Sequence, residues 1–118
     1  MSHTFPKSRH VRQRREFDRI YRQGRVLQDE FFRIHYCTLQ NSSEPGHLGL
    51  TVGKSLGKAV QRNRIKRILR EVFRQHPEFS VGLELIVQPK PALALLANAK
   101  ISEFFLQMLQ NLRGRTHR

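Results

Sequence analysis

The chain has 118 residues, with 22 lysines and arginines against nine aspartates and glutamates, and its formal net charge is +13. Such a charge favours a polyanionic partner, of which nucleic acid is the first candidate and an anionic membrane surface the second. Its length predicts a single domain, residues 1–118, with a modest core. The single cysteine excludes an internal disulfide or a multi-cysteine zinc module, and neither a bilayer-spanning apolar run nor an apolar signal segment is present, so we expect a cytoplasmic protein.

Both ends of the chain are basic: residues 1–13 predict an extended N-terminal arm, and residues 113–118 predict a frayed C-terminal tail. A short helix is predicted for residues 14–23, because apolar residues recur at the spacing of one helix face, namely Phe17, Ile20 and Tyr21. Gly24 fits the C′ position that ends a helix.

Residues 30–39 are rich in β-branched and aromatic residues and predict a strand. Alternation assigns one face of this strand to Phe32, Ile34 and Tyr36. The other face is more polar and is expected to look outward; it carries Phe31, Arg33, His35 and Cys37. Residues 40–46 have the composition of a turn, and residues 47–52 are expected to return as an antiparallel strand.

The most informative segment is 53–74, which carries eight lysines and arginines and one acid, Glu71. A helix over about residues 58–75 is predicted by a buried apolar stripe made of Ile65, Ile68, Leu69, Val72 and Phe73. At about 100° per residue, the adjoining arc gathers Arg62, Asn63, Lys66, Arg67, Arg70 and Arg74. A helix that is only solvated usually interleaves acids to relieve repulsion. This imbalance therefore predicts contact with nucleic acid phosphates.

Residues 83–87 predict a third core strand, and Pro89 and Pro91 are expected to prevent its continuation in a paired register. A short helical turn is expected at residues 92–97. A last helix, ending at Gly114, is predicted by a second amphipathic stripe of Ile101, Phe104, Phe105, Met108, Leu109 and Leu112. The order helix-strand-strand-helix-strand-helix predicts a small α+β sandwich, one sheet with helices packed on it.

No arrangement of side chains predicts catalysis by the protein itself. The six histidines show neither i, i+4 pairing nor metal-ligand spacing. Asp29 and Glu30 are adjacent, but neighbours in a strand point to opposite faces. The loop from Gly53 to Gly57 lacks the phosphate-loop pattern, and Cys37 has no evident activating base. We predict no catalytic and no metal-binding residues, so a role in RNA processing would need its catalysis from elsewhere.

The run from Ala59 to Arg67, continued by Arg70-Glu71 and Phe73-Arg74, resembles the signature helix of the bacterial ribonuclease P protein subunit. Further segments resemble that family in the right order: Arg15-Glu16-Phe17, Tyr21-Arg22-Gln23-Gly24, Leu48-Gly49-Leu50-Thr51-Val52, Leu85-Ile86-Val87 and Lys90-Pro91-Ala92. The resemblance implies a central, mainly antiparallel sheet with a left-handed β-α-β crossover.

The resemblance also implies a function. In that family a large RNA hydrolyses precursor tRNA with RNA-bound magnesium ions. The chain is then expected to bind ribonuclease P RNA and the 5′ leader of precursor tRNA, and so to assist removal of the leader. Mg²⁺ would be held mainly by the RNA, with no dedicated protein site. No membrane partner is expected, and the protein would be a monomer in the holoenzyme.

By position, the residues expected to face the catalytic RNA are Lys54, Lys58, Arg62, Asn63, Arg64, Lys66, Arg67 and Arg70. The resemblance implies a leader-binding cleft between the first helix and the sheet, lined by Phe17, Tyr21, Arg33 and His35. Exposed rings in a basic groove stack on single-stranded bases without demanding a sequence. Phe17 fits core packing as well. A register slip of one residue would instead line the cleft with Phe32, Ile34 and Tyr36.

Three positions depart from the family pattern. Gly53-Lys54-Ser55 stands where Ser-Lys-Lys is common, Pro89 where arginine is frequent, and His35 where another aromatic residue is usual. One alternative is a small basic ribosomal or other structural RNA-binding protein, which explains the charge but not the Arg-Asn-Arg helix with cleft aromatics. The other, a metal-dependent nuclease acting alone, needs clustered carboxylates that this chain lacks.

Overall fold

The computed structural model describes residues 14–116, so the predicted arm at residues 1–13 and the last two residues of the predicted tail lie outside it. Within this range the chain forms three α-helices, four strands and three short 3-10 helices. Their bounds in chain order are α1 Arg14–Gln23, β1 Arg25–Gln28, β2 Phe32–Thr38, β3 His47–Leu50, η2 Lys54–Leu56, α2 Ala59–Gln75, η3 Pro77–Phe79, β4 Leu83–Pro89, η4 Pro91–Leu95 and α3 Asn98–Thr116.

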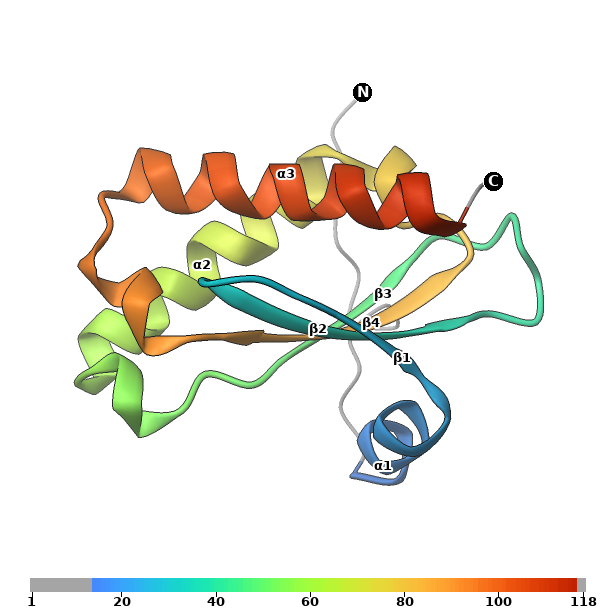
Figure 1. The fold of residues 1–118 in the computed structure, drawn as a ribbon, viewed down its shortest axis with the longest axis horizontal. Coiled ribbons are helices and arrows are strands. Elements are labelled where there is room, and N and C mark those ends of the chain that lie inside the picture. The colour runs from blue at the N-terminus through green and yellow to red at the C-terminus, as the bar shows by residue number, and fades with distance from the viewer. Residues whose placement is uncertain (1–13, 117–118) are drawn as a thin grey trace.

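The elements form three layers, with one four-stranded sheet in the middle. The strand order is β1-β2-β4-β3, and α2 and α3 lie on one face of the sheet while α1 lies on the other (Figure 1). The predicted α+β sandwich is confirmed. None of the helices between residues 14 and 116 is long and apolar enough to cross a membrane.

The order of the strands differs from the prediction in two ways. Residues 47–52 were expected to pair antiparallel with the preceding strand, but β3 pairs in parallel with β4, with Leu48 opposite Leu85. The prediction was wrong because β4 inserts between β2 and β3. The edge strand β1 was missed, since it has only four residues and pairs with β2 through a tight connection.

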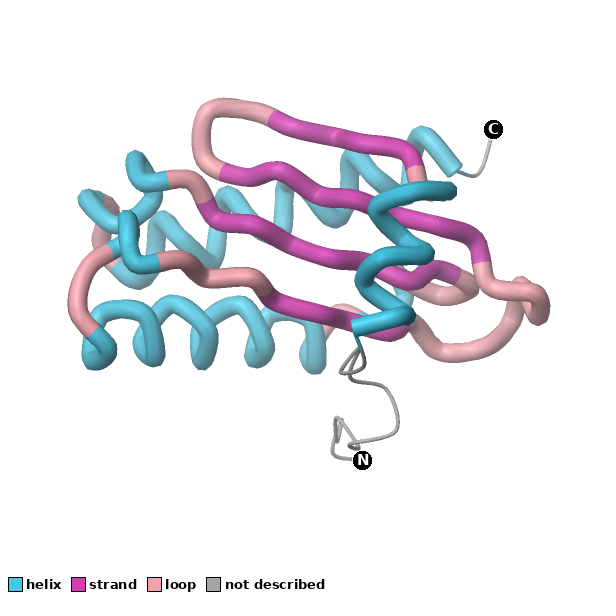
Figure 2. The backbone as a smooth tube through the Cα atoms, turned by 90° about the horizontal axis from the view of Figure 1, so that it is seen from below, coloured by secondary structure: helices cyan, strands magenta, loops and turns pink. Residues whose placement is uncertain are grey.

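The unit β3–α2–β4 is the β-α-β crossover that the resemblance implies. The two strands run side by side in the same direction, and α2 joins them behind the sheet in the view from below (Figure 2). When the sheet is seen from the side of α2 with both strands pointing upward, β4 lies to the left of β3, so the connection is left-handed. The crossover places the start of α2 at the ends of the two strands.

The main core lies between the sheet and the pair α2 and α3. The predicted inward face of β2 is confirmed, because Phe32, Ile34 and Tyr36 are all buried in this core. Helix α3 contributes its predicted stripe, with Phe104 half-buried beside Ile101, Phe105, Met108, Leu109 and Leu112. A one-residue slip of β2 is therefore excluded.

Two expectations about helix and strand ends need correction. Strand β4 continues through Pro89, which lies opposite Phe32 at the end of the ladder, where a missing N–H costs no further pairing. Helix α3 passes through Gly114 to Thr116, because a glycine alone does not end a helix and nothing crowds this position.

Helix α1 ends where predicted, but the role of Gly24 is different. Its N–H donates to the carbonyl of Ile20 at 2.8 Å, and its φ is not positive. A Cβ here would lie 2.4 Å from the Ile20 oxygen and 2.8 Å from the Tyr36 oxygen. Glycine is required because α1 and β2 approach each other closely, not because the chain adopts a left-handed conformation.

Candidate nucleic-acid interface

Helix α2 presents an outward row of polar residues opposite its apolar stripe. Ile65, Leu69, Val72 and Phe73 are buried, and Ile68 is half-buried. Asn63, Arg67 and Arg70 follow one another at i, i+4 and i+7 and are all exposed. We call these three residues the outer row. Because the buried stripe anchors the helix, the outer row is held in a fixed line.

The positive charge of the outer row is not neutralised within the protein. The single acid of α2, Glu71, accepts hydrogen bonds from Arg74, which lower the pKa of its carboxyl group. Within residues 14–116, no ion pair involves Arg67 or Arg70. Two guanidinium groups of the row therefore remain available to bind phosphate, and each offers a bidentate fork.

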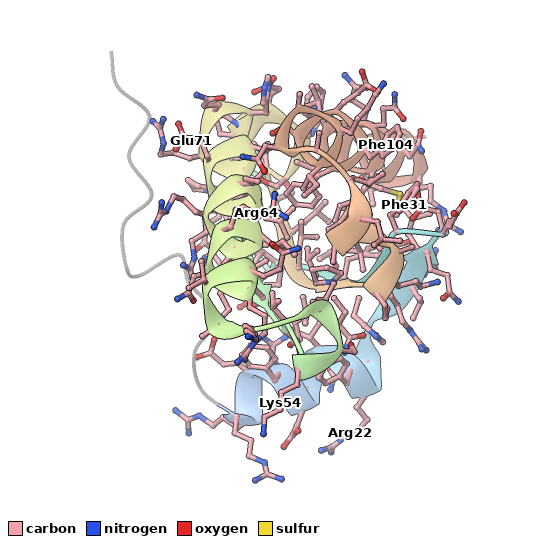
Figure 3. The ribbon with its side chains drawn as sticks, turned by 90° about the vertical axis from the view of Figure 1, so that its left-hand side faces the viewer. Arg22, Phe31, Lys54, Arg64, Glu71 and Phe104 are labelled. Atoms are coloured by element: carbon pink, nitrogen blue, oxygen red, sulfur yellow. The ribbon has the colours of Figure 1, made fainter. Side chains whose placement is uncertain are left out.

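Arg64 lies on a different side of α2 from Glu71 and binds within the protein (Figure 3). Its Nε and Nη2 atoms donate to the Gln61 side-chain oxygen at 3.1 and 2.9 Å, and its Nη1 donates to Asn98. Gln61 in turn donates to the Ala94 carbonyl at 3.0 Å. Arg64 thus ties α2 to η4 and to the start of α3, while its predicted contact with RNA stays a prediction.

The remaining predicted RNA-facing residues extend the same side of the molecule. Lys54 in η2 is exposed (Figure 3). Lys58, the residue before α2, is exposed too, whereas Lys66 is half-buried. The Nε of Arg62 donates to the carbonyl of Gly57 at 3.2 Å. Gly57 has a φ of 116°, a conformation that L side chains rarely adopt. This turn brings the two lysines to the N-terminal end of α2.

The predicted leader-binding residues meet on the opposite face of the sheet, beneath α1. The Tyr21 ring stands edge-on to the His35 ring at a centroid distance of 4.6 Å, and Phe17 lies 6.4 Å from Tyr21. Tyr21 is 37% exposed, and Arg33 is exposed beside it. We call Tyr21, His35 and Arg33 the Tyr21 surface.

His35 forms the floor of this surface and is not a stacking ring open to solvent. It is only 8% exposed, because α1 covers the middle of the β2 face that was expected to look outward. Burial, and secondarily the charge of Arg33, lower the pKa of His35, while a hydrogen bond with Gln88 acts in the opposite direction. The neutral imidazole is therefore favoured, and its Nδ1 has no hydrogen-bond partner in the part of the chain that the structure describes.

Phe17 follows in large part the core-packing alternative, whereas Phe31 lies away from its predicted face. Phe17 is half-buried and packs against the small cluster of Ile20 and Ile86, so core packing accounts for much of its surface. Phe31 does not share the His35 face. Its ring stacks on Phe104 of α3 at 5.1 Å, because Asp29 accepts the N–H groups of Phe31 and Phe32 and turns the chain before β2 begins.

Sequence reasoning missed two residues that complete the Tyr21 surface, Thr51 and Gln88, and one that holds α1 on the sheet, Glu84. The Tyr21 hydroxyl lies 3.5 Å from the Thr51 hydroxyl and 3.4 Å from the Gln88 amide nitrogen. Glu84, on the same face of β4 as Gln88, binds Arg19 of α1. The signal was present in the strand itself, where Glu84 and Gln88 are polar residues at even spacing in an apolar run.

Comparison with known proteins identifies the family. The family model described as Ribonuclease P matches residues 5–113. The chain belongs to the ribonuclease P protein family. The ribonuclease P protein component of Desulfotalea psychrophila is 41% identical over 99 residues, covering 83% of this chain and 81% of that protein. The component from Thermotoga maritima is 33% identical over 95 residues, covering 80% of each.

Solved structures of ribonuclease P proteins share the fold. The Staphylococcus aureus protein superposes with a TM-score of 0.80 at 27% identity, covering 90% of this chain and 95% of that one. The Thermotoga maritima protein gives a TM-score of 0.77 at 29% identity, with 86% and 96% covered. As a ribonuclease P protein, the chain is a subunit of an endoribonuclease.

Proposed function

We propose that this ribonuclease P protein binds the catalytic RNA through the outer row of α2 and the 5′ leader of precursor tRNA through the Tyr21 surface. The observation that carries the proposal is the row Asn63, Arg67 and Arg70. The buried stripe of α2 anchors this row, and no acidic side chain among residues 14–116 pairs with its two arginines. Folded RNA presents phosphates at regular intervals, and a fixed line of guanidinium groups complements such an array. Nothing favours the alternative of a ribosomal protein.

The Tyr21 surface suits a single-stranded leader. Its exposed ring offers a stacking face, and Arg33 offers a phosphate contact next to it. Stacking on a ring depends little on the identity of the base, which fits leaders of varied sequence. The two surfaces lie on opposite faces of the sheet, so the protein would hold the leader while α2 is docked on the catalytic RNA.

We further propose that the magnesium ions of the reaction are held mainly by the RNA. Mg²⁺ prefers several oxygen ligands, usually carboxylates and phosphates. Residues 14–116 contain no group of three or more His, Cys, Asp or Glu side chains placed to hold a metal. The protein's own contribution is positive charge beside RNA phosphates, which lowers the repulsion when the leader joins the catalytic RNA.

The decisive experiment is cleavage of precursor tRNA by the purified protein with and without ribonuclease P RNA at low magnesium. We expect the protein to stimulate cleavage only when that RNA is present. A variant with both Arg67 and Arg70 changed to alanine should lose most of the stimulation, whereas Lys100→Ala should retain it. Cleavage by the protein alone would refute the proposal.

A cytoplasmic, monomeric protein is part of the same proposal. The net charge of +13 creates repulsion between copies, which disfavours self-association in the absence of RNA. Analytical ultracentrifugation of the protein alone and of the reconstituted holoenzyme tests this. We expect one copy of the protein for each catalytic RNA, and two copies would refute the proposal that the protein is a monomer in the holoenzyme.

A further inference from the structure

A second basic site lies at the β1 edge of the sheet, away from both surfaces described above. An open pocket of about 420 Å³ is formed where α1, the edge of β2 and the C-terminal end of α3 meet. Its size falls within the range of about 300–1,000 Å³ that is typical of small-molecule sites. In Figure 1 α1 and the C-terminal end of α3 lie at the same end of the sheet, while α2 begins at the other end.

Three arginines that are distant in sequence line this pocket: Arg19, Arg25 and Arg115. Arg19 is neutralised by Glu84, and none of the acidic residues between positions 14 and 116 lines the pocket. Arg115 donates only to the neutral carbonyl of Val26, at 3.4 Å, and within residues 14–116 no ion pair involves Arg25. Two exposed positive charges at the pocket are therefore uncompensated, and together they attract an anion.

Hydrogen-bond donors accompany this charge. Thr38 and Thr116 line the pocket beside the arginines. The Thr116 hydroxyl already donates within α3, to the carbonyls of Leu112 and Arg113 at 3.1 and 3.3 Å, so the hydroxyl donor available to a ligand is that of Thr38. Strand β2 extends two residues beyond its last pair with β1, which is Tyr36 opposite Arg25. The Leu39 N–H donates to Gly82 on the β4 side, so by alternation the N–H of Thr38 points to the outer edge. The pocket thus offers hydroxyl and backbone donors as well as guanidinium groups.

The backbone fixes this arrangement in place. Gly24 lies between Arg19 and Arg25, and its close approach to the Tyr36 carbonyl leaves no room for a side chain. Arg19 is additionally held by its ion pair with Glu84. One of the three guanidinium groups is therefore already held in place, and the backbone from which Arg25 extends is fixed, which reduces the entropy that is lost on binding a ligand.

We propose that this pocket is a second phosphate-binding site, which takes one phosphodiester of an RNA backbone together with its sugar. The volume suits a unit of this size, and convergent guanidinium and hydroxyl donors are the usual ligands of phosphate. Binding of phosphate by this pocket does not depend on the proposed function, whereas the identity of the RNA that supplies the phosphate does. The protein would then contact RNA at both ends of the sheet.

The first test uses inorganic phosphate and the full chain labelled with ¹⁵N, at constant ionic strength. We expect the amide signals of Thr38 and Thr116 to shift and saturate. Arg25→Ala and Arg115→Ala should each weaken this binding by about tenfold, the effect of losing a charge-assisted hydrogen bond. Lys100→Ala removes one exposed charge from the same helix as Arg115 and should bind as the unchanged protein does. The dispersion of each spectrum shows whether the variant is folded.

The second test uses Cys37, which lines the pocket and is the only cysteine of the chain. Phosphate should slow its alkylation by N-ethylmaleimide, and so should whichever RNA occupies the site. Ribonuclease P RNA, precursor tRNA and mature tRNA are added separately to distinguish these sources. Protection by phosphate without protection by any RNA would overturn the assignment to an RNA backbone.

The inference fails entirely if phosphate neither shifts the Thr38 and Thr116 amides saturably nor protects Cys37. It also fails if Lys100→Ala weakens binding as much as Arg115→Ala, because the effect would then be one of net charge. Either failure is separate from the proposed function, since stimulation of cleavage through the outer row of α2 is measured independently.

Discussion

The guanidinium group of Arg19 lies 2.5 Å from the carboxylate of Glu84, and this ion pair joins α1 to β4 in the middle of the sheet. The Glu84 side chain is 11% exposed and that of Arg19 is 41% exposed. A nearly buried carboxylate requires such a partner. Because α1 also carries Tyr21, the pair fixes the position of the proposed leader-binding surface.

Arg19→Ala is expected to lower the free energy of unfolding by about 1–3 kcal/mol, because it leaves the Glu84 carboxylate without its partner. Urea unfolding followed by circular dichroism measures this change. Arg22→Ala removes an exposed arginine from the same helix and should change the stability by no more than about 0.5 kcal/mol. Equal effects of the two substitutions would show that the ion pair does not stabilise α1 on the sheet.

Arg67→Ala is expected to weaken binding to ribonuclease P RNA and to reduce the salt dependence of that binding. The slope of log K against log salt should fall by about 0.7–0.9 for each lost phosphate contact. Filter binding over a range of salt concentrations gives the slope. Lys100→Ala, which removes a charge from α3, should keep the original slope. An unchanged slope for Arg67→Ala would place Arg67 outside the RNA interface.

Arg64→Ala is expected to act mainly on stability. The substitution removes the hydrogen bonds to Gln61 and Asn98 that join α2 to the start of α3. A loss of about 1–2 kcal/mol in the free energy of unfolding is expected from these contacts. The salt dependence of RNA binding should stay close to that of the unchanged protein. A reduced slope with unchanged stability would instead assign Arg64 to the RNA interface.

Tyr21→Ala is expected to weaken binding of precursor tRNA to the holoenzyme more than binding of mature tRNA, because only the precursor has a leader. Loss of one stacked base corresponds to about 1–3 kcal/mol. Tyr21→Phe keeps the ring and loses only the hydroxyl group near Thr51 and Gln88, so it should retain most of the affinity. Equal losses for precursor and mature tRNA would remove Tyr21 from the leader-binding surface.

His35 is expected to make the stability depend on pH. Its folded-state pKa is lowered below the ordinary value of 6.5, first by burial and then by Arg33, so the unfolded chain takes up a proton more readily. The contribution of neutral His35 to the free energy of unfolding is therefore fully present above the unfolded-state pKa. It falls as the pH drops through that value, until His35 becomes protonated in the folded protein too. Urea unfolding at about pH 7.5 and about pH 5.5 tests this prediction. His35→Phe should remove this part of the dependence, and an equal dependence in both proteins would contradict it.

Local patterns in the sequence predicted those features that depend only on residues close together in the chain, such as the buried stripe of α2 and the two faces of β2. The apolar stripe of α2 recurs every three to four residues, so the burial of Ile65, Leu69 and Phe73 and the exposure of Arg67 follow from helix geometry. The faces of β2 follow in the same way from a period of two. Alternation also assigned Phe31 to the outer face of β2, and this was wrong because a turn precedes the strand there.

The Tyr21 surface was predictable only in part. The resemblance placed Phe17, Tyr21, Arg33 and His35 near one another, and the structure brings Tyr21 and His35 into contact. The resemblance did not indicate that α1 buries His35, or that Thr51 and Gln88 lie at the Tyr21 hydroxyl. These contacts join α1, β2, β4 and the segment after β3, and no local pattern relates segments so far apart in sequence.

The basic helix, its buried stripe and its excess of positive charge were determined by the sequence alone, because each depends on residues within a few turns of one another. The tertiary structure decided which of its arginines remain available to RNA. Asn98 and Gln61 bind Arg64, whereas Arg67 is exposed and forms no ion pair with any residue from 14 to 116. It also decided that Arg19, Arg25 and Arg115 share one pocket. The partner of a polar side chain depends on packing between distant segments, and that packing forms only when the whole chain folds.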